Sequence, residues 1–141
     1  LSRAQSVLSR YQIMTGIIFF DLNDFKSVND RYGHIIGDEL LVSIGRTIQS
    51  NIRDCDLVAR LGGDELGVLL FKTEEKMARR KALSLAKLIQ DTTIEMPTGD
   101  IGVSTSYGVA MVKPNISPEK VLSEADSDMY RNKREFARIS D

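Results

Sequence analysis

The sequence has one cysteine, no long apolar run and almost no net charge, and each of these scarcities excludes a class of protein. Cys55 alone cannot form a disulfide within the chain, which suits a reducing compartment. The longest apolar run, Ile17 to Phe20, is far too short to span a bilayer, and no signal peptide opens the chain. We therefore expect a cytoplasmic domain without membrane contact of its own, although the full-length protein can carry an anchor elsewhere.

The charge is nearly balanced. The 19 basic and 20 acidic residues leave a net charge of -1, which gives no global field for a nucleic-acid backbone, so phosphate binding must be local. A length of 141 residues fits one domain, 1–141, with a core of its own, and no repeat or linker divides it. The chain lacks an initiator methionine, so we expect it to be excised from a longer multidomain protein.

Hydrophobic spacing predicts an alternation of strands and helices. Strands are expected at Gly16–Asp21, Asp56–Leu61, Glu65–Phe71 and Ile101–Val112. Helices are expected at Phe25–Arg31 and along Ala78–Ile89. A further helix is expected from Asp38, with an apolar stripe of Leu40, Leu41, Ile44, Ile48 and Ile52. The last helix is expected after Ser117-Pro118, with one face made of Val121, Leu122, Ala125 and Met129. The order β-α-α-β-β-α-β-α predicts an α+β fold, a ferredoxin-like split βαβ core with an antiparallel hairpin at its centre.

Acidic residues stand at the end of the first strand and in the hairpin turn. Asp21 ends the strand, and Asp64 and Glu65 follow Gly62-Gly63 in a turn expected beside that strand end. Three convergent carboxylates suit Mg²⁺, and two such ions can promote an in-line phosphoryl transfer. The two glycines let backbone N–H groups approach a phosphate. The alternative is that Gly-Gly-Asp-Glu is only a hairpin turn.

A second polar group follows the first strand. The helix start at Asp24 and Phe25 offers free N–H groups to an anion, and Lys26 adds a positive charge there. Asn29 lies three residues from Lys26, so the two share a helix face. Asp38 opens the next predicted helix. The alternatives are a helix-end turn at Asn29 and an ordinary N-cap at Asp38.

Four runs follow one another along the chain: FFDLNDFKSVNDRYGHIIGDELL, RDCDLVARLGGDEL, VSTSYGVA and SEADSDMY. In order and spacing they closely resemble the GGDEF family of diguanylate cyclases, over nearly the whole chain. The resemblance implies a palm-like sheet related to nucleotide cyclases, with one GTP bound per domain. It also implies a transient homodimer in which each 3′-hydroxyl attacks the partner's α-phosphate to give cyclic di-GMP, and an N-terminal sensory module in the full-length protein.

The resemblance implies a metal site for Mg²⁺ or Mn²⁺. Asp21 and Asp64 look like its carboxylates, the Leu22 carbonyl like a further ligand, and Glu65 like a metal ligand or base.

The same resemblance implies the substrate contacts. Asn29 and Asp38 match guanine readers, and Lys26 and Lys133 match phosphate contacts. His34 lacks a nearby cysteine or second histidine, so we interpret it as structural.

An inhibitory product site is also implied, because Arg53 and Asp56 form the family's R-x-x-D motif shortly before the Gly-Gly turn. An arginine can stack on guanine and bind its edge or a phosphate. The alternative is an exposed surface ion pair. A second arginine expected on the helix after the hairpin is not evident, although Lys87 lies near that place.

The chain departs from the family pattern in further places. Leu66 replaces the signature Phe, Ala137 occupies a usual Arg position, and the opening motif is missing before Leu1. Two other functions therefore compete with an active cyclase. The first is a module that binds GTP or cyclic di-GMP without turnover, which Ala137 favours. The second is a nucleic-acid polymerase palm, which the neutral charge and small size disfavour.

Overall fold

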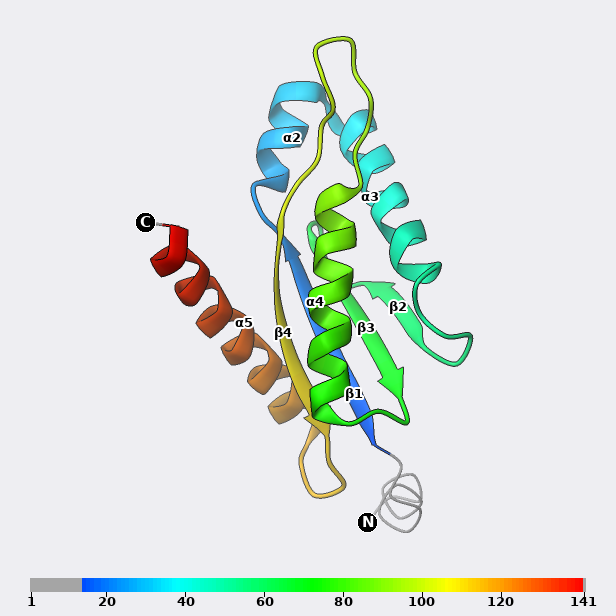
Figure 1. The fold of residues 1–141 in the computed structure, drawn as a ribbon, viewed down its shortest axis with the longest axis vertical. Coiled ribbons are helices and arrows are strands. Elements are labelled where there is room, and N and C mark those ends of the chain that lie inside the picture. Colours follow the sequence, from blue (N-terminus) through cyan, green and yellow to red (C-terminus); the bar gives the residue numbers. More distant parts are fainter. Residues whose placement is uncertain (1–13, 141) are drawn as a thin grey trace.

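The computed structural model describes the backbone of residues 14–140 and the side chains of residues 14–133. Its elements, in chain order, are β1 (Thr15–Leu22), α2 (Phe25–Tyr32), α3 (His34–Gln49), β2 (Leu57–Arg60), β3 (Glu65–Phe71), α4 (Glu75–Asp91), β4 (Thr105–Val112) and α5 (Pro118–Ser140) (Figure 1). The predicted order of strands and helices is confirmed. Ala137 lies beyond the described side chains, and Leu1 beyond the described residues.

The four strands form one antiparallel sheet in the order β2-β3-β1-β4. β3 lies between β1 and β2, and β1 lies between β3 and β4, which is the split βαβ arrangement repeated twice. The α+β prediction is therefore confirmed. The β2–β3 hairpin does not stand at the centre of the sheet, because β2 is an edge strand; β1 and β3 are the inner pair.

Alternation along β1 separates the two faces of the sheet. Ile18, Phe20 and Leu22 are fully buried in the main core, to which α3 and α4 contribute. Ile17 and Phe19 point the other way and pack in a smaller cluster with Val121 and Ala125 of α5. In Figure 1, α4 crosses in front of the sheet and α5 runs along the β4 side. Asp21 continues the second face, at the end of β1.

Helix α3 begins one turn earlier than the apolar stripe predicted. Gly33, at φ 90°, ends α2 and precedes α3, a backbone conformation that glycine adopts without a steric cost. Helix α3 therefore starts at His34, and Asp38 lies inside it. The N-cap alternative for Asp38 is wrong, and so is the helix-end turn for Asn29, which lies within α2.

The last strand is shorter than its sequence pattern. We expected β-structure from Ile101, but β4 starts at Thr105, and Ile101 makes only an isolated bridge with Ile94. Two residues predicted on the apolar faces of helices are not found there: Ile52 follows the end of α3, and Leu122 is exposed on α5. None of the helices described in residues 14–140 is both long and apolar enough to cross a membrane.

Candidate functional site

A cleft of about 420 Å³ lies between α2, α3 and the β2–β3 turn. Its lining residues are Phe25, Lys26, Asn29, His34, Asp38, Arg60, Gly63 and Asp64. Six of these were singled out from the sequence as substrate or metal residues, although they come from three separate elements. Because α3 begins at His34, Asp38 lies inside the helix and lines the cleft from there.

Asn29 is held in the cleft wall by a close approach of two helices. Its side-chain Oδ1 is buried without a hydrogen-bond partner. A β-carbon at Gly37 of α3 would overlap that oxygen, so glycine is required for Asn29 to keep this position. Leaving a buried acceptor without a donor costs about 1–3 kcal/mol, so folded proteins contain few such groups. That oxygen is buried against α3, so it is the place of Asn29 in the cleft lining that makes it a candidate for contact with a ligand.

The N-terminus of α2 is shaped by Asp24, which precedes the helix in a left-handed conformation with φ 57°. Its side chain makes no cap hydrogen bond. Phe25 is buried at the base of the cleft, whereas Lys26 is exposed beside it. The first turn of α2 thus presents a lysine and uncapped N–H groups near the cleft, an arrangement that favours an anion.

The backbone brings the predicted metal residues together. Asp21 pairs with Glu65 across β1 and β3, and the Leu22 N–H donates to the Asp64 carbonyl at 2.9 Å. The prediction that the turn lies beside the end of β1 is therefore confirmed.

The carboxylates themselves do not converge. The Asp21 carboxylate binds Lys133 Nζ at 3.0 Å, and Glu65 Oε2 turns toward Gly62, 3.5 Å from the place of an added β-carbon. Within the described part of the chain, no three His, Cys, Asp or Glu side chains form a group that could hold a metal. The remaining donors, two aspartates and the Leu22 carbonyl, still fit Mg²⁺, which takes one or two carboxylates and completes its shell with water and phosphate.

Two residues of the cleft were not predicted as ligand contacts. Arg60 donates to the carbonyls of Gly62 and Gly63, each at 3.0 Å, and so holds the turn from the side. The signal available in the sequence was a basic residue just before the two glycines. His34 lies exposed at the cleft wall, at the start of α3. Five other predicted site residues do not line this cleft: Asp21, Asp24, Gly62, Glu65 and Lys133. Lys133 lines a separate pocket on α5.

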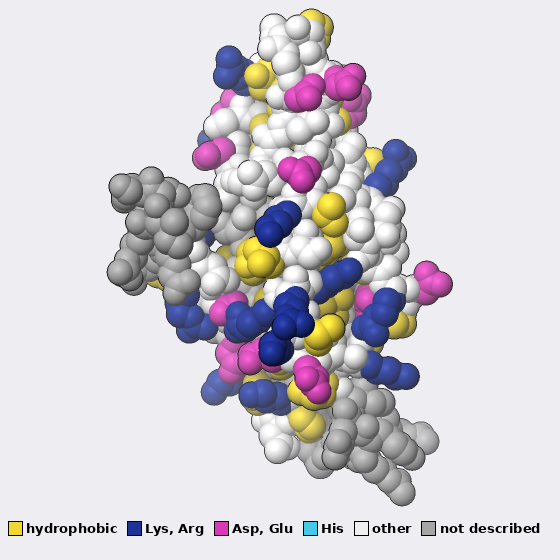
Figure 2. Space-filling model, in the orientation of Figure 1, with side chains coloured by type: hydrophobic (Ala, Val, Ile, Leu, Met, Phe, Trp, Pro, Cys, Tyr) yellow, Lys and Arg dark blue, Asp and Glu magenta, His cyan; other side chains and the backbone are white. Residues whose placement is uncertain are grey.

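A second cavity, of about 510 Å³, lies at the predicted product site. Arg53 and Asp56 line it together with Lys72, Arg80 and Lys81. A second arginine, Arg80, lines this cavity from α4, about two helical turns before Lys87, whereas Lys87 does not line it. Figure 2 shows Lys and Arg side chains gathered over the α4 face of the molecule.

Asp56 is not part of an exposed surface pair, because it is only 3 % exposed. It accepts hydrogen bonds from Arg53 Nε at 3.1 Å, from the Arg53 N–H at 3.0 Å and from the Phe71 N–H at 3.1 Å. Arg53 also donates to the Phe71 carbonyl. Burial alone raises the pKa of Asp56, but the donors outweigh it and hold the pKa below its usual value. The hydrogen bond with Asp56 raises the pKa of Arg53.

The chain is similar to known proteins over nearly its whole length. The family model described as "Diguanylate cyclase, GGDEF domain" matches residues 1–138. Diguanylate cyclase TpbB of Pseudomonas aeruginosa is 37% identical over 138 residues, which are 96% of this chain and 32% of that protein. The chain thus spans about a third of the length of this curated relative.

Solved structures agree with the sequence comparison. The crystal structure of the GGDEF domain of TpbB, also named YfiN, matches with a TM-score of 0.81 and 36% identity, over 96% of this chain and 85% of that one. The GGDEF domain of DgcB from Caulobacter crescentus, solved in complex with c-di-GMP, has the same fold, with a TM-score of 0.82, 23% identity and coverage of 95% and 80%. By fold, by the residues around the cleft and by these matches, the chain belongs to the GGDEF domain family of diguanylate cyclases.

Proposed function

We propose that this chain condenses two GTP molecules into cyclic di-GMP, with release of pyrophosphate. The observation that supports the proposal best is the cleft, because it gathers a lysine, an amide, a carboxylate and a glycine turn around one space of about 420 Å³. That combination offers separate contacts for a base edge and for phosphates. Use of GTP as substrate would also place the chain in the cytoplasm.

Guanine recognition falls to Asn29 and Asp38, which face the cleft from α2 and α3. A carboxylate accepts from the N–H groups on the guanine edge, whereas adenine would leave it unpaired, so the pair favours GTP over ATP. Lys26 and the N–H groups at the start of α2 bind phosphate oxygens, together with the backbone of Gly62 and Gly63. Arg60 keeps that turn in place through the two glycine carbonyls.

The transfer takes place beside Asp21 and Asp64. Mg²⁺ or Mn²⁺, when bound by these carboxylates and the Leu22 carbonyl, supplies Lewis-acid stabilisation of charge on the transferring phosphate. Glu65 acts as a further ligand or as the base for the attacking hydroxyl. Lys133, next to Asp21, contacts phosphate oxygens. Each 3′-oxygen forms a bond to the α-phosphorus of the other GTP, each hydroxyl proton passes to a base, and each bond from α-phosphorus to the bridging oxygen breaks.

A single cleft holds one GTP, so closing the two-fold product requires a transient, symmetric pair of chains. Product feedback is proposed for the cavity with Arg53, where Arg80 and Lys81 add positive charge. Since Arg53 already binds Asp56 and Phe71, the product would use its exposed face, and Arg80 supplies the second guanidinium.

The decisive experiment is incubation of the protein with GTP and Mg²⁺, followed by chromatography for cyclic di-GMP. The Asp21→Asn, Asp64→Asn and Glu65→Gln variants should stay folded and lose product formation, because these carboxylates serve the reaction and not the core. Asp91→Asn, an exposed change at the end of α4, is the matched control. Near-normal turnover in the Asp64→Asn variant would refute the metal assignment.

A module that binds nucleotide without turnover is the second candidate. The observation that favours this candidate is that the side chains of Asp21, Asp64 and Glu65 do not come together as a group that could hold a metal ion. Binding of a GTP analogue with no product from the parent protein at any concentration would establish it.

A further inference from the structure

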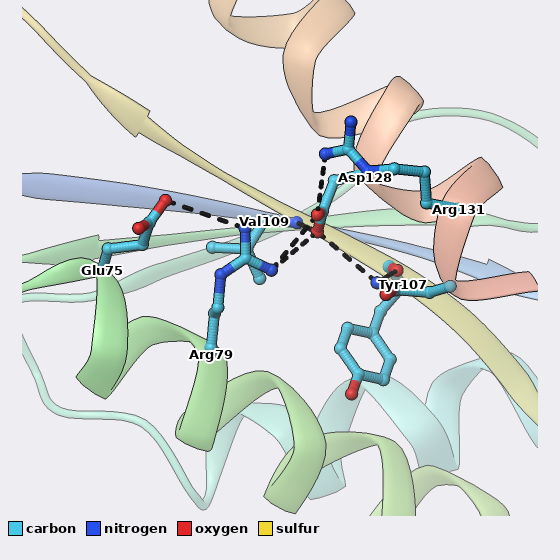
Figure 3. A network of polar contacts seen from close by, with 7 residues as sticks. Glu75, Arg79, Tyr107, Val109, Asp128 and Arg131 are labelled. Atoms are coloured by element: carbon cyan, nitrogen blue, oxygen red, sulfur yellow. Dashed lines mark hydrogen bonds and ion pairs between the residues drawn. The ribbon is translucent and has the colours of Figure 1, made fainter. Parts of the chain in front are cut away.

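A buried carboxylate outside the cleft is the feature that the proposed function does not use. Asp128 of α5 is only 5 % exposed, and it lies where α4, β4 and α5 meet (Figure 3). Asp128 was not singled out from the sequence, since an aspartate on an amphipathic helix is usually a surface residue. Burying a carboxylate is costly unless it is fully paired, so its partners indicate what it does.

The partners of Asp128 come from two other elements. Its Oδ2 accepts the N–H of Val109 on β4 at 2.8 Å and Arg79 of α4 at 3.0 Å. Arg131, one turn along α5, donates to Oδ1 at 3.2 Å. Burial by itself raises the pKa of Asp128, but these donors outweigh it and keep the pKa below the usual value. Pairing with Asp128 in turn raises the pKa of Arg79.

Asp128 and its neighbour Asn132 together cover the outer edge of the sheet. β4 is an edge strand of the described sheet, and every second residue of such a strand has an N–H and a C=O without a strand partner. Asp128 accepts the N–H of Val109, and Asn132 Nδ2 donates to the carbonyl of Tyr107 at 2.7 Å. The two bonds come from α5 residues that are four positions apart and reach β4 residues that are two positions apart. They therefore form together in one register of α5 along β4.

Close packing reinforces that register. A β-carbon at Gly108 would overlap the Ala125 carbonyl and lie 2.5 Å from the Met129 N atom, so the α5 backbone rests directly on β4. Lys133 follows Asn132 and binds Asp21 Oδ2 at 3.0 Å. A slip of α5 by one residue would move Lys133 by about 1.5 Å along the helix and rotate it by about 100°. The contact with Asp21 would then be lost.

We propose that Asp128 is a positioning residue of the phosphoryl-transfer site: it holds α5 in one register on the β4 edge and thereby sets Lys133 against Asp21. The proposal rests on the proposed function for its effect on catalysis. Its structural part, the dependence of Lys133 on Asp128, does not need turnover and can be measured without it.

The catalytic test is a double-mutant cycle of Asp128→Asn with Lys133→Met. If Asp128 acts through Lys133, Asp128→Asn should lower kcat/KM about tenfold in the parent and less than about twofold in the Lys133→Met background, because coupled residues are non-additive. An equal loss in both backgrounds would mean that Asp128 only supports the fold, and the proposal would be overturned.

The structural test is the acetylation rate of Lys133 by acetic anhydride, followed by mass spectrometry with the exposed Lys113 as internal reference. Loss of the Asp21 contact should raise the Lys133 rate several-fold in Asp128→Asn. The rise should be smaller in Asn132→Ala, which removes the bond to Tyr107 and a long one to Asp128 Oδ2 but leaves Asp128 paired with Val109 and Arg79, and which keeps the test usable if Asp128→Asn fails to fold. Arg131→Gln is the control: Arg131 is 67% exposed and pairs with Asp128 within α5, so it should leave the rate unchanged.

The two tests separate the proposals. A parent protein that makes no cyclic di-GMP would refute the proposed function, while faster labelling of Lys133 in Asp128→Asn would still support the positioning role. Unchanged labelling in both Asp128→Asn and Asn132→Ala would overturn that role whether or not the parent is active.

Discussion

Gly37→Ala should weaken GTP binding while leaving the fold intact, because an added β-carbon would displace Asn29 from the cleft wall. Alanine in a helix interior is normally more stable than glycine by about 0.5–1 kcal/mol. At Gly37, however, the new carbon would overlap Asn29 Oδ1, lie 3.0 Å from Asn29 Cγ and lie 3.3 Å from Phe25 Cζ. The end of an Asn side chain can rotate away, so the contacts should cost little. We therefore expect the stabilisation by alanine in the helix and the destabilisation by these contacts to offset each other in the free energy of unfolding.

The displaced Asn29 would no longer contact guanine. A hydrogen bond contributes about 0.5–1.5 kcal/mol net, which corresponds to GTP binding about 2- to 12-fold weaker. The same helix offers a matched control, since nothing lies within 4 Å of a β-carbon added at Gly45. Gly45→Ala should therefore raise Tm by about 2–4 °C with unchanged affinity.

The assay is calorimetric titration of the parent and both variants with a non-hydrolysable GTP analogue and Mg²⁺, alongside thermal unfolding. If Gly37→Ala binds the analogue as tightly as Gly45→Ala does, either Asn29 does not read the base or Gly37 does not hold it in place. In both cases the reasoning from the close approach of α2 and α3 would be refuted.

Other perturbations test the remaining features. Asp56→Ala should lower the free energy of unfolding by about 1–3 kcal/mol at neutral pH, because it leaves the partly buried Phe71 N–H without its acceptor; urea unfolding at several pH values measures the change. The pKa of Asp56 is lower in the folded chain than in the unfolded one, where it is about 3.9. The ionised carboxylate therefore stabilises the fold above that pH, and this stabilisation is lost as the pH falls through the folded pKa. The difference in free energy of unfolding between parent and variant should narrow below about pH 4. Gly108→Ala should lower Tm, whereas Gly45→Ala should raise it, because the backbone atoms of α5 that a β-carbon at Gly108 would meet cannot rotate aside; equal Tm values for the two variants would contradict the packing. Arg80→Ala should weaken cyclic di-GMP binding in calorimetry while Lys87→Ala does not, and equal losses would place the product elsewhere. Specific activity should rise with protein concentration, and a constant value in a confirmed monomer would rule out the paired mechanism.

Much of this protein was determined by local sequence. The alternation of apolar residues and turn signals gave the order of the strands and helices, because each element buries a face that its own spacing defines. Asp21 and the Gly-Gly-Asp-Glu turn could be placed together, since antiparallel pairing of β1 with β3 sets Asp21 opposite Glu65. Even the boundary error of α3 was local: its buried apolar stripe begins at Leu40, whereas the helix itself begins with two exposed residues, His34 and Ile35.

Only the tertiary structure decided which distant side chains meet. Arg80 reaches the cavity of Arg53 because α4 crosses the sheet there, and no spacing rule links the two positions. Asp128 pairs with Arg79, 49 residues earlier, across the edge of β4. Hydrophobic patterning determines which face of a helix is buried, but the register of that helix against a strand depends on close contacts such as Gly108 and on polar groups at the strand edge. Sequence periodicity carries no information about those contacts, so the buried carboxylate and its link to Lys133 were visible only in the folded chain.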